Sequence, residues 1–238
     1  MAIKKNKTTK VVTAKKDKKS VILDIIKKKP NKKFLKATQK DYYNTLIDNE
    51  ITICTGPAGV GKSFIAMRTA IELLVDKENS YEKIVIVRPA VEAEEELGSL
   101  PGDLNEKLDP YIYPSYYLLD KIISKTARDE LVEHEIVSPL ALGYMRGMNI
   151  DNTILIFEEA QNTTPKQMKL LLTRIGFNSK FFISGDIEQS DRFKDKTKSG
   201  LYDAIHKLKN IDGVGNYEFG IDDIVRNPLI NKILKRYE

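Results

Sequence analysis

The sequence predicts an α/β fold with three layers, α/β/α, around a mainly parallel sheet. Three observations predict it. Short apolar runs recur along the chain, as expected for strands that are buried on both faces of a sheet. Stretches with helical periodicity alternate with these runs. A glycine-rich segment, GPAGVGKS, separates the first run from a helical stretch, and acidic residues follow a later run.

The first half of the chain supplies a helix, a strand, a helix and a strand. Residues Ala37–Asp48 have the apolar spacing of an amphipathic helix, and Ile51–Thr55 is the first buried strand. A helix over 63–75 and a strand over 84–87 follow. Residues 91–150 are acidic and then rich in Pro and Tyr, and we interpret them as a helical insertion that crosses the edge of the sheet. The remaining expected elements are strands over 154–157, 181–184 and 217–219, and a helix over 165–175 with Thr164 as its N-cap.

Positive charge is concentrated at the N-terminal end. Residues 1–40 hold 15 Lys and two acids, a net charge of +13, whereas the whole chain carries +5, so residues 41–238 carry −8. We expect residues 1–33 to form a Lys-rich flexible arm and residues 34–238 to form a single domain. The arm is either a solvated tail or a segment that contacts the phosphates of nucleic acid.

Composition also bounds the compartment. The single cysteine, Cys54, makes a disulfide within the chain impossible and fits a reducing environment. No apolar run approaches the roughly 20 residues of a membrane helix, and the VILDII run after the lysines is too short for a secretory signal. We therefore expect a cytoplasmic protein with no membrane partner, in a bacterial or phage-infected host cell.

The glycine-rich segment, residues 56–63, matches G-x-x-x-x-G-K-[ST] at every fixed position and has a strand before it and a helix after it. Its glycines let backbone N–H groups converge on phosphate oxygens. Lys62 is expected to reach the β- and γ-phosphates, and Ser63 to bind Mg²⁺. The sequence thus predicts a P-loop NTPase with ATP and Mg²⁺ as cofactors. The nucleotide-binding residues expected from this segment are Gly56, Pro57, Ala58, Gly59, Val60, Gly61, Lys62, Ser63 and Phe64.

Two later strands end in polar groups. In ILIFEEAQN, Glu158 is expected to help to hold Mg²⁺ and Glu159 to polarise the attacking water, although two solvated acids at a strand end are the alternative. In FFISGDIEQ, Gln189 is expected to face the γ-phosphate, although an ordinary Gly-Asp turn also explains this segment.

These segments, in this order, resemble the PhoH family, the phosphate-starvation-inducible P-loop ATPases related to superfamily 1 helicases. The other segments similar to the family are RPAVEA (88–93), LPGDLNEKLDPY (100–111), PLALGYMRG (139–147), EEAQNTTPKQMKLLLTRIG (158–176), SGDIEQ (184–189) and DDIVRNPLI (222–230). The resemblance implies a RecA-like fold. It also implies specific roles: Gln39 on the adenine side with Tyr42 or Tyr43 as a stacking partner, Gln189 as the helicase-like motif III glutamine, and Arg174 and Arg226 near the γ-phosphate.

The chain departs from the family pattern at Glu158, where the family normally has Asp. Glu is one methylene longer, and Mg²⁺ demands near-ideal octahedral geometry. A water-mediated contact could absorb the difference, or hydrolysis could be slower.

The arginines suggest an assembly. Superfamily 1 helicases place their γ-phosphate arginines on a second RecA-like domain. This chain has room for only one such domain in total. Arg174 or Arg226 would then act in trans, in a ring that the resemblance implies is a hexamer. Alternatively, Arg174 forms a local salt bridge and Arg226 caps a helix. Arg88 and Arg146 are candidates for contact with a nucleic-acid backbone or for a subunit interface.

The leading functional hypothesis is Mg²⁺-dependent ATP hydrolysis coupled to single-stranded RNA or DNA by an oligomeric, helicase-like motor. Its proposed catalytic residues are Lys62, Glu159, Gln189, Arg174 and Arg226. Two alternatives stay open. One is a nucleotide-gated scaffold with little turnover, which Glu158 favours. The other is a P-loop kinase acting on a small molecule, which the Lys- and Asp-rich segment DRFKDKTKSG disfavours because such kinases need an Arg-rich lid.

Overall fold

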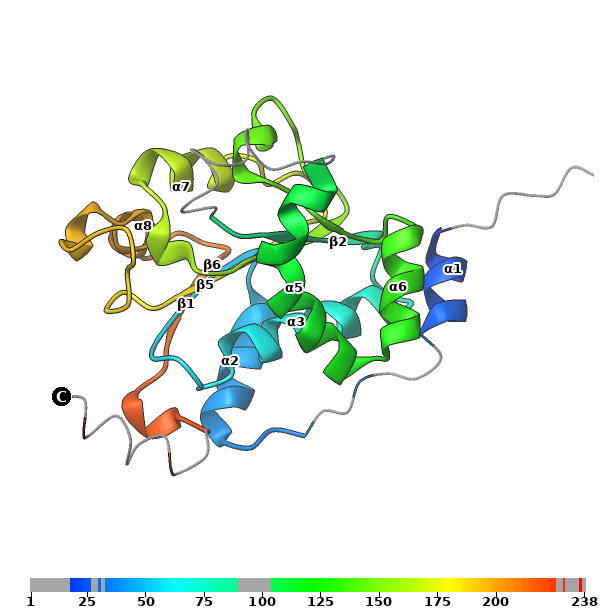
Figure 1. Ribbon diagram of the computed structural model, residues 1–238, viewed down its shortest axis with the longest axis horizontal. Coiled ribbons are helices and arrows are strands. Elements are labelled where there is room, and N and C mark those ends of the chain that lie inside the picture. The colour runs from blue at the N-terminus through cyan, green and yellow to red at the C-terminus, as the bar shows by residue number, and fades with distance from the viewer. Residues whose placement is uncertain are drawn as a thin grey trace, which may run out of the picture.

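A six-stranded, all-parallel sheet forms the centre of the computed structural model (Figure 1). The structure describes residues 18–26, 30, 33–89, 104–225, 229 and 236, without the side chains of 104–110. The strand order is β3-β2-β4-β5-β1-β6. The strands are β1 (Ile51–Thr55), β2 (Lys83–Val87), β3 (Val137–Pro139), β4 (Thr153–Phe157), β5 (Lys180–Gly185) and β6 (Val214–Glu218).

Helices cover both faces of this sheet (Figure 1). In β2, Ile84 and Ile86 point into one apolar core, whereas Val85 and Val87 point into the other, as the period of two in a strand requires. The first core is covered by α1 (Lys18–Ile25), α2 (Ala37–Asp48), α3 (Lys62–Val75), α5 (Leu104–Ile122) and α6 (Lys125–Glu133). The second is covered by η1 (Leu142–Met145), α7 (Pro165–Leu172) and α8 (Gly200–Lys207). The predicted three-layer α/β/α fold is confirmed.

Several boundaries agree with the prediction. The helix Ala37–Asp48 and the strand Ile51–Thr55 have the predicted limits. Thr164 caps α7 in a capping box with Gln167, as its position before a proline predicts. The expected extension of this helix to residue 175 is wrong: α7 ends at Leu172. The Thr173 N–H and hydroxyl both bond to the Lys169 carbonyl, and the chain then turns toward β5.

The expected helical insertion over 91–150 needs correction. Residues 104–150 contain α5 and α6, but they also contribute β3, which pairs with β2 at the edge of the sheet. The strand is short and ends at Pro139, which cannot donate to a further ladder and suits an edge position. Residues 90–103 lie outside the described part. The helix α8 was not predicted, and β6 begins three residues before the expected strand at 217–219.

The arm predicted over 1–33 is in part a helix. Residues Lys18–Ile25 form α1, which packs on α3 and α6, and its Ile22 is fully buried. The Lys19 ammonium donates to the carbonyls of Leu74 and Asn79 at 2.7 and 2.9 Å. The short apolar run among the lysines therefore docks on the domain. Residues 1–17 lie outside the described part, so a flexible arm there stays a prediction.

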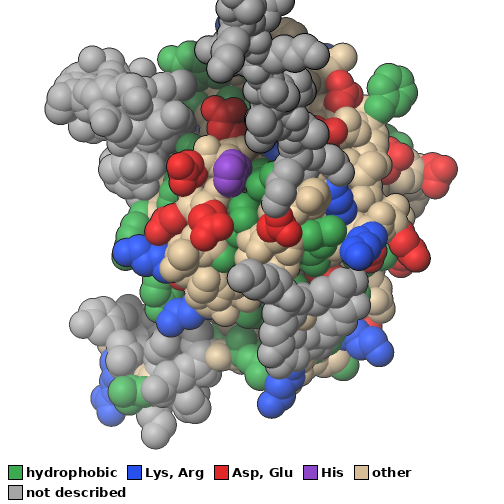
Figure 2. Space-filling model, turned by 90° about the vertical axis from the view of Figure 1, so that its right-hand side faces the viewer, with side chains coloured by type: hydrophobic (Ala, Val, Ile, Leu, Met, Phe, Trp, Pro, Cys, Tyr) green, Lys and Arg blue, Asp and Glu red, His purple; other side chains and the backbone are tan. Residues whose placement is uncertain are grey.

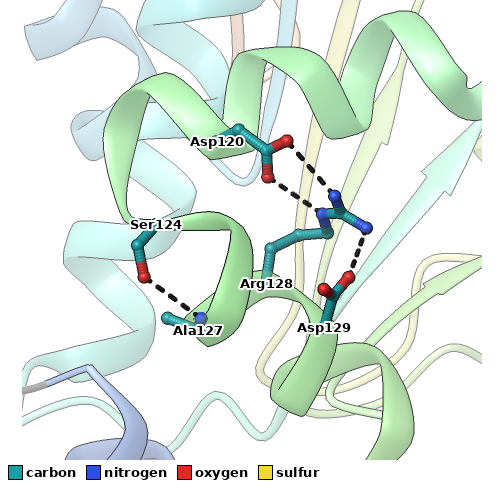
Figure 3. A network of polar contacts seen from close by, with 5 residues as sticks. All are labelled: Asp120, Ser124, Ala127, Arg128 and Asp129. Atoms are coloured by element: carbon teal, nitrogen blue, oxygen red, sulfur yellow. Dashed lines mark hydrogen bonds and ion pairs between the residues drawn. The ribbon is translucent and has the colours of Figure 1, made fainter.

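The corner between α5 and α6 is tied by polar contacts (Figure 3). Ser124 caps α6 by accepting from the Ala127 N–H. The Arg128 guanidinium donates to both carboxylate oxygens of Asp120, at 3.0 and 3.2 Å, and to Asp129 at 2.5 Å. These contacts hold α6 against α5, which in turn packs on α3. Within the described ranges, no helix is long and apolar enough to cross a membrane.

Candidate phosphate-binding site at the carboxyl ends of the strands

The loop between β1 and α3 has the backbone that its glycines predict. Gly56, Gly59 and Gly61 have φ values of 137°, 91° and 100°, a region that side-chain-bearing residues rarely adopt. A Cβ on Gly56 would lie 2.7 Å from the Cβ of Phe219, which follows β6. The Gly59 carbonyl accepts from the Val225 N–H at 3.0 Å. The loop is therefore fixed from the β6 side as well as by its own sequence.

Lys62 begins α3 and reaches back over the loop. Its ammonium donates to the carbonyls of Gly56 and Pro57 at 2.6 and 3.0 Å. The positive charge thus lies at the N-terminal end of α3, where the helix dipole also favours an anion. A phosphate placed on the loop would meet both.

A cavity of about 310 Å³ opens beside this loop. Its lining brings together residues from all three predicted motifs, together with Leu118 of α5. From the loop and α3 come Ala58, Gly59, Gly61, Lys62, Ser63 and Phe64. From the ends of β4 and β5 come Glu159, Ser184, Gly185, Asp186 and Gln189. Because β5 lies between β1 and β4, their carboxyl ends form one continuous edge, and the motifs converge there.

Glu159 lies at the mouth of this cavity. It is exposed and has φ 55°, in the left-handed region, where the chain turns sharply from β4 into η2 (Ala160–Asn162). Its carboxylate accepts from the Gln161 amide at 2.7 Å. Gln189 lines the same cavity, so the two residues predicted to handle water and the γ-phosphate lie around one space.

Gln161 is the residue that sequence reasoning missed. It is almost fully buried, and its amide nitrogen donates to Glu159 and to the Gln189 carbonyl, at 2.7 and 3.1 Å. Its amide oxygen accepts from the Asp186 N–H at 3.1 Å. A Cβ on Gly185 would lie 2.6 Å from that oxygen. One side chain therefore joins the ends of β4 and β5; the only signal in the sequence was a Gln just after the paired acids.

Glu158 lies in different surroundings from its neighbour. Its side chain is 1% exposed, and the oxygen Oε2 accepts from the Arg88 guanidinium at 3.2 Å and from the buried Ser115 hydroxyl of α5. Arg88 also donates to the Tyr111 carbonyl at 3.2 Å. Arg88, expected on a nucleic-acid or subunit surface, instead pairs with this acid because β2 and β4 are adjacent and in register.

The second oxygen of Glu158, Oε1, is buried and has no hydrogen-bond partner among the described residues. A buried carboxylate oxygen in this position suits a cation. In the described part of the chain, no three His, Cys, Asp or Glu side chains form a metal cluster. Mg²⁺ does not need one, because it is usually held by one or two protein groups and by substrate phosphates. Ser63 and Glu158 are the residues that fit this role.

The residues expected on the adenine side are Gln39 and Tyr42 or Tyr43. Gln39 is buried. Its amide donates to the Val60 carbonyl and accepts from the Leu35 N–H, so it ties the phosphate loop to the start of α2. Tyr42 is fully buried, with its ring centroid 5.4 Å from that of Phe219, and the expectation that it stacks on a base is wrong. Burial raises the pKa of the Tyr42 hydroxyl and that of the Cys54 thiol, so both groups stay uncharged in this core. The Tyr43 hydroxyl donates to Glu72.

Two of the remaining predicted arginines, Arg174 and Arg146, do not line this cavity. Arg174 donates to the Met148 carbonyl and the Thr173 hydroxyl, and its own carbonyl accepts from Ile150, just before β4 begins. It therefore lies near the amino-terminal ends of the strands, whereas the phosphate loop of the same chain lies at their carboxyl ends. Arg146 is exposed and lines a separate hollow. Arg226 lies outside the described residues.

Comparison with known proteins gives a consistent result. The family model described as PhoH-like protein matches residues 33–238. The chain is 44% identical over 200 residues to the PhoH-like protein of Bacillus subtilis (strain 168), covering 84% of this chain and 62% of that protein. It is 42% identical over 200 residues to the PhoH-like protein of Synechocystis sp., covering 84% and 60%. The chain thus spans about three fifths of the length of these relatives.

A solved structure confirms the fold class. The large terminase from a thermophilic bacteriophage superposes with a TM-score of 0.54 at 10% identity, covering 87% of this chain and 51% of the terminase. This likeness concerns the fold alone, and together with the phosphate loop it identifies the P-loop NTPase architecture that the sequence predicts.

Proposed function

The chain belongs to the PhoH-like protein family, and from that premise we propose that it is a Mg²⁺-dependent ATPase coupled to single-stranded RNA. The observation that carries the proposal is the convergence of Lys62, Glu159 and Gln189 on one cavity beside the phosphate loop. A nucleotide-binding protein without turnover needs the loop. It does not need an acid and a glutamine at the ends of two further strands.

The chemistry follows from these positions. The loop N–H groups and Lys62 hold the β- and γ-phosphates. Glu159 accepts the proton of a water molecule whose oxygen attacks the γ-phosphorus, while the bond from that phosphorus to the β–γ bridging oxygen breaks. Gln189 orients the water and the γ-phosphate. Mg²⁺, held by Ser63 and Glu158, would neutralise charge that develops on the phosphate oxygens.

The nucleic-acid partner is proposed from the charge distribution and from the helicase-like order of the motifs. A net charge of +13 in residues 1–40 favours a polyanion. We further propose a ring, with six subunits as the family resemblance implies. The location of Arg174 near the amino-terminal ends of the strands supports this. From there, that arginine could serve a phosphate site only in a neighbouring subunit.

The test is steady-state MgATP hydrolysis by the purified chain, with and without single-stranded RNA. We expect hydrolysis that RNA stimulates, and a hexamer by light scattering in the presence of ATP. Hydrolysis that is indifferent to RNA and to single-stranded DNA would refute the coupling. Tight ATP binding without hydrolysis would instead identify a nucleotide-gated scaffold, and transfer of phosphate to a small molecule would identify a kinase.

Replacing Gln161 gives a sharper test of the site. Gln161→Ala removes the side chain that joins Glu159 to the β5 end, and we expect hydrolysis to fall roughly 10- to 100-fold while ATP affinity changes little. Gln161→Glu keeps the shape but sets a carboxylate against that of Glu159, so its activity should be lower still. Kinetics at saturating ATP, with ATP affinity measured separately, check this. If both variants were as active as the unmodified chain, Gln161 would not position Glu159 for hydrolysis.

A further inference from the structure

A second hollow, of about 470 Å³, lies between η1, the start of α7 and the loop after β5. Three cationic side chains from these three segments line it: Arg146, Lys166 and Arg192. Gln167, Thr164 and Leu170 complete the lining, so within the described part of the chain it contains no acid. The neighbouring Asp191 carboxylate faces the Asn162 amide, 3.5 Å away. A concave surface of this kind suits a phosphate group.

The charge on this side contrasts with the other end of the molecule. Figure 2 shows acidic side chains gathered on the end where α1 and α6 lie. Asp129, Glu130 and Glu133 of α6 are all exposed. The exposed carboxylates of α6 repel a polyanion locally, whereas the cations that line the hollow beside α7 attract one. Arginine also matches a phosphate better than lysine does, because its planar fork can donate two parallel hydrogen bonds.

Exposed aromatic side chains accompany these cations. Tyr144, two residues before Arg146, is 60% exposed. The Arg192 guanidinium lies 5.5 Å from the ring centroid of Phe193, which is only partly buried. Cations that contact a backbone, together with aromatic rings on which bases can stack, are typical of surfaces that bind single strands without sequence preference.

The hollow is joined to the phosphate site through two consecutive residues. Gln161 bonds to Glu159 and to the Gln189 carbonyl. The next residue, Asn162, accepts at its side-chain oxygen from the N–H groups of Asp191 and Arg192, at 3.0 and 3.4 Å. A ligand that moved the 190–192 segment would therefore act on the residues around the γ-phosphate position.

From these observations we infer that the hollow lined by Arg146, Lys166 and Arg192 binds the phosphodiester backbone of single-stranded nucleic acid. The inference rests on the proposed function and gives it a location. Through η2, binding there bears on the position of Glu159 and Gln189. An acidic surface of a second copy of the chain is the competing occupant, and the concave shape and the adjacent aromatic rings favour nucleic acid.

The test is a triple variant, Arg146→Ala, Lys166→Ala and Arg192→Ala, in the full chain. Its matched control carries Lys77→Ala, Lys125→Ala and Lys209→Ala, three exposed lysines away from the hollow whose loss changes the net charge equally. Binding of fluorescent single-stranded RNA and DNA is measured by anisotropy over a series of salt concentrations. We expect the triple variant to bind roughly tenfold more weakly or worse, with the salt slope reduced by about 2, because each lost phosphate contact removes about 0.7. The control should change the slope little, and only the triple variant should lose stimulation of hydrolysis.

The outcomes separate this inference from the proposed function. If the unmodified chain binds no single strand and RNA does not stimulate it, the proposed function fails. If it binds and the triple variant binds equally, with the same salt slope, the location is wrong and the function stands. If light scattering shows that the triple variant loses its oligomeric state while its subunits still bind RNA unchanged, the hollow is a subunit interface and the inference is overturned.

Discussion

Replacement of Lys62 by alanine is expected to lower the rate of ATP hydrolysis roughly 100-fold or more. The Lys62 ammonium lies over the loop and donates to the Gly56 and Pro57 carbonyls. Among the described residues that line the cavity, it is the one positively charged side chain. The transition state for phosphoryl transfer spreads charge over the γ-phosphate oxygens, so a cation fixed at this point stabilises it. The measurement is phosphate release at saturating MgATP.

The control for this variant is Lys77→Ala. Lys77 is exposed and lies two residues after α3 ends, so it has the same side-chain chemistry but does not line the cavity. Its hydrolysis rate should match that of the unmodified chain. If Lys62→Ala retained more than about a tenth of the original rate, the loop would not be the catalytic phosphate site.

The elements that the sequence predicts well are those whose information is local. The phosphate loop, β1 and α2 each depend on a pattern within about a dozen residues: glycines at fixed spacing, a buried run, a helical period. By contrast, β3 is three residues long and is a strand only because β2 lies beside it. The helix α1 follows the same logic, since Ile22 is buried only against other elements.

The site divides in the same way. Lys62, Ser63, Glu159 and Gln189 line the cavity as the motifs predict, because each lies within a few residues of the carboxyl end of β1, β4 or β5, and these ends lie side by side. The environment of Glu158 could not be predicted, because Arg88 and Ser115 are 70 and 43 residues away in the sequence. Tyr42 shows the reverse failure: an aromatic residue close to the loop in sequence is buried by β6, whose extent the sequence does not reveal.

The paired acids should therefore differ in their effect on stability, because Glu158 takes part in a buried ion pair as well as in the proposed Mg²⁺ site, whereas Glu159 does not. Glu158→Ala leaves the Arg88 guanidinium and the buried Ser115 hydroxyl without their carboxylate. Losing one partner of a buried ion pair costs about 3 kcal/mol of unfolding free energy or more, which lowers Tm by roughly 6–12 °C in a chain of this size. This should be seen without nucleotide or Mg²⁺, because the contacts are within the protein.

Glu159→Ala is the matched variant one residue later, and it should behave in the opposite way. The side chain is exposed, so its loss should change the unfolding free energy by about 0.5 kcal/mol at most. Hydrolysis should nevertheless fall by roughly 100-fold or more, since the proposed general base is gone. Thermal unfolding and phosphate release, measured on both variants, decide the matter. A stability loss shared by both would contradict the buried pairing of Glu158, and full activity in Glu159→Ala would assign the base elsewhere. The two adjacent carboxylates differ because of burial. Glu158 is buried against Arg88 and Ser115, whereas Glu159 lines the cavity.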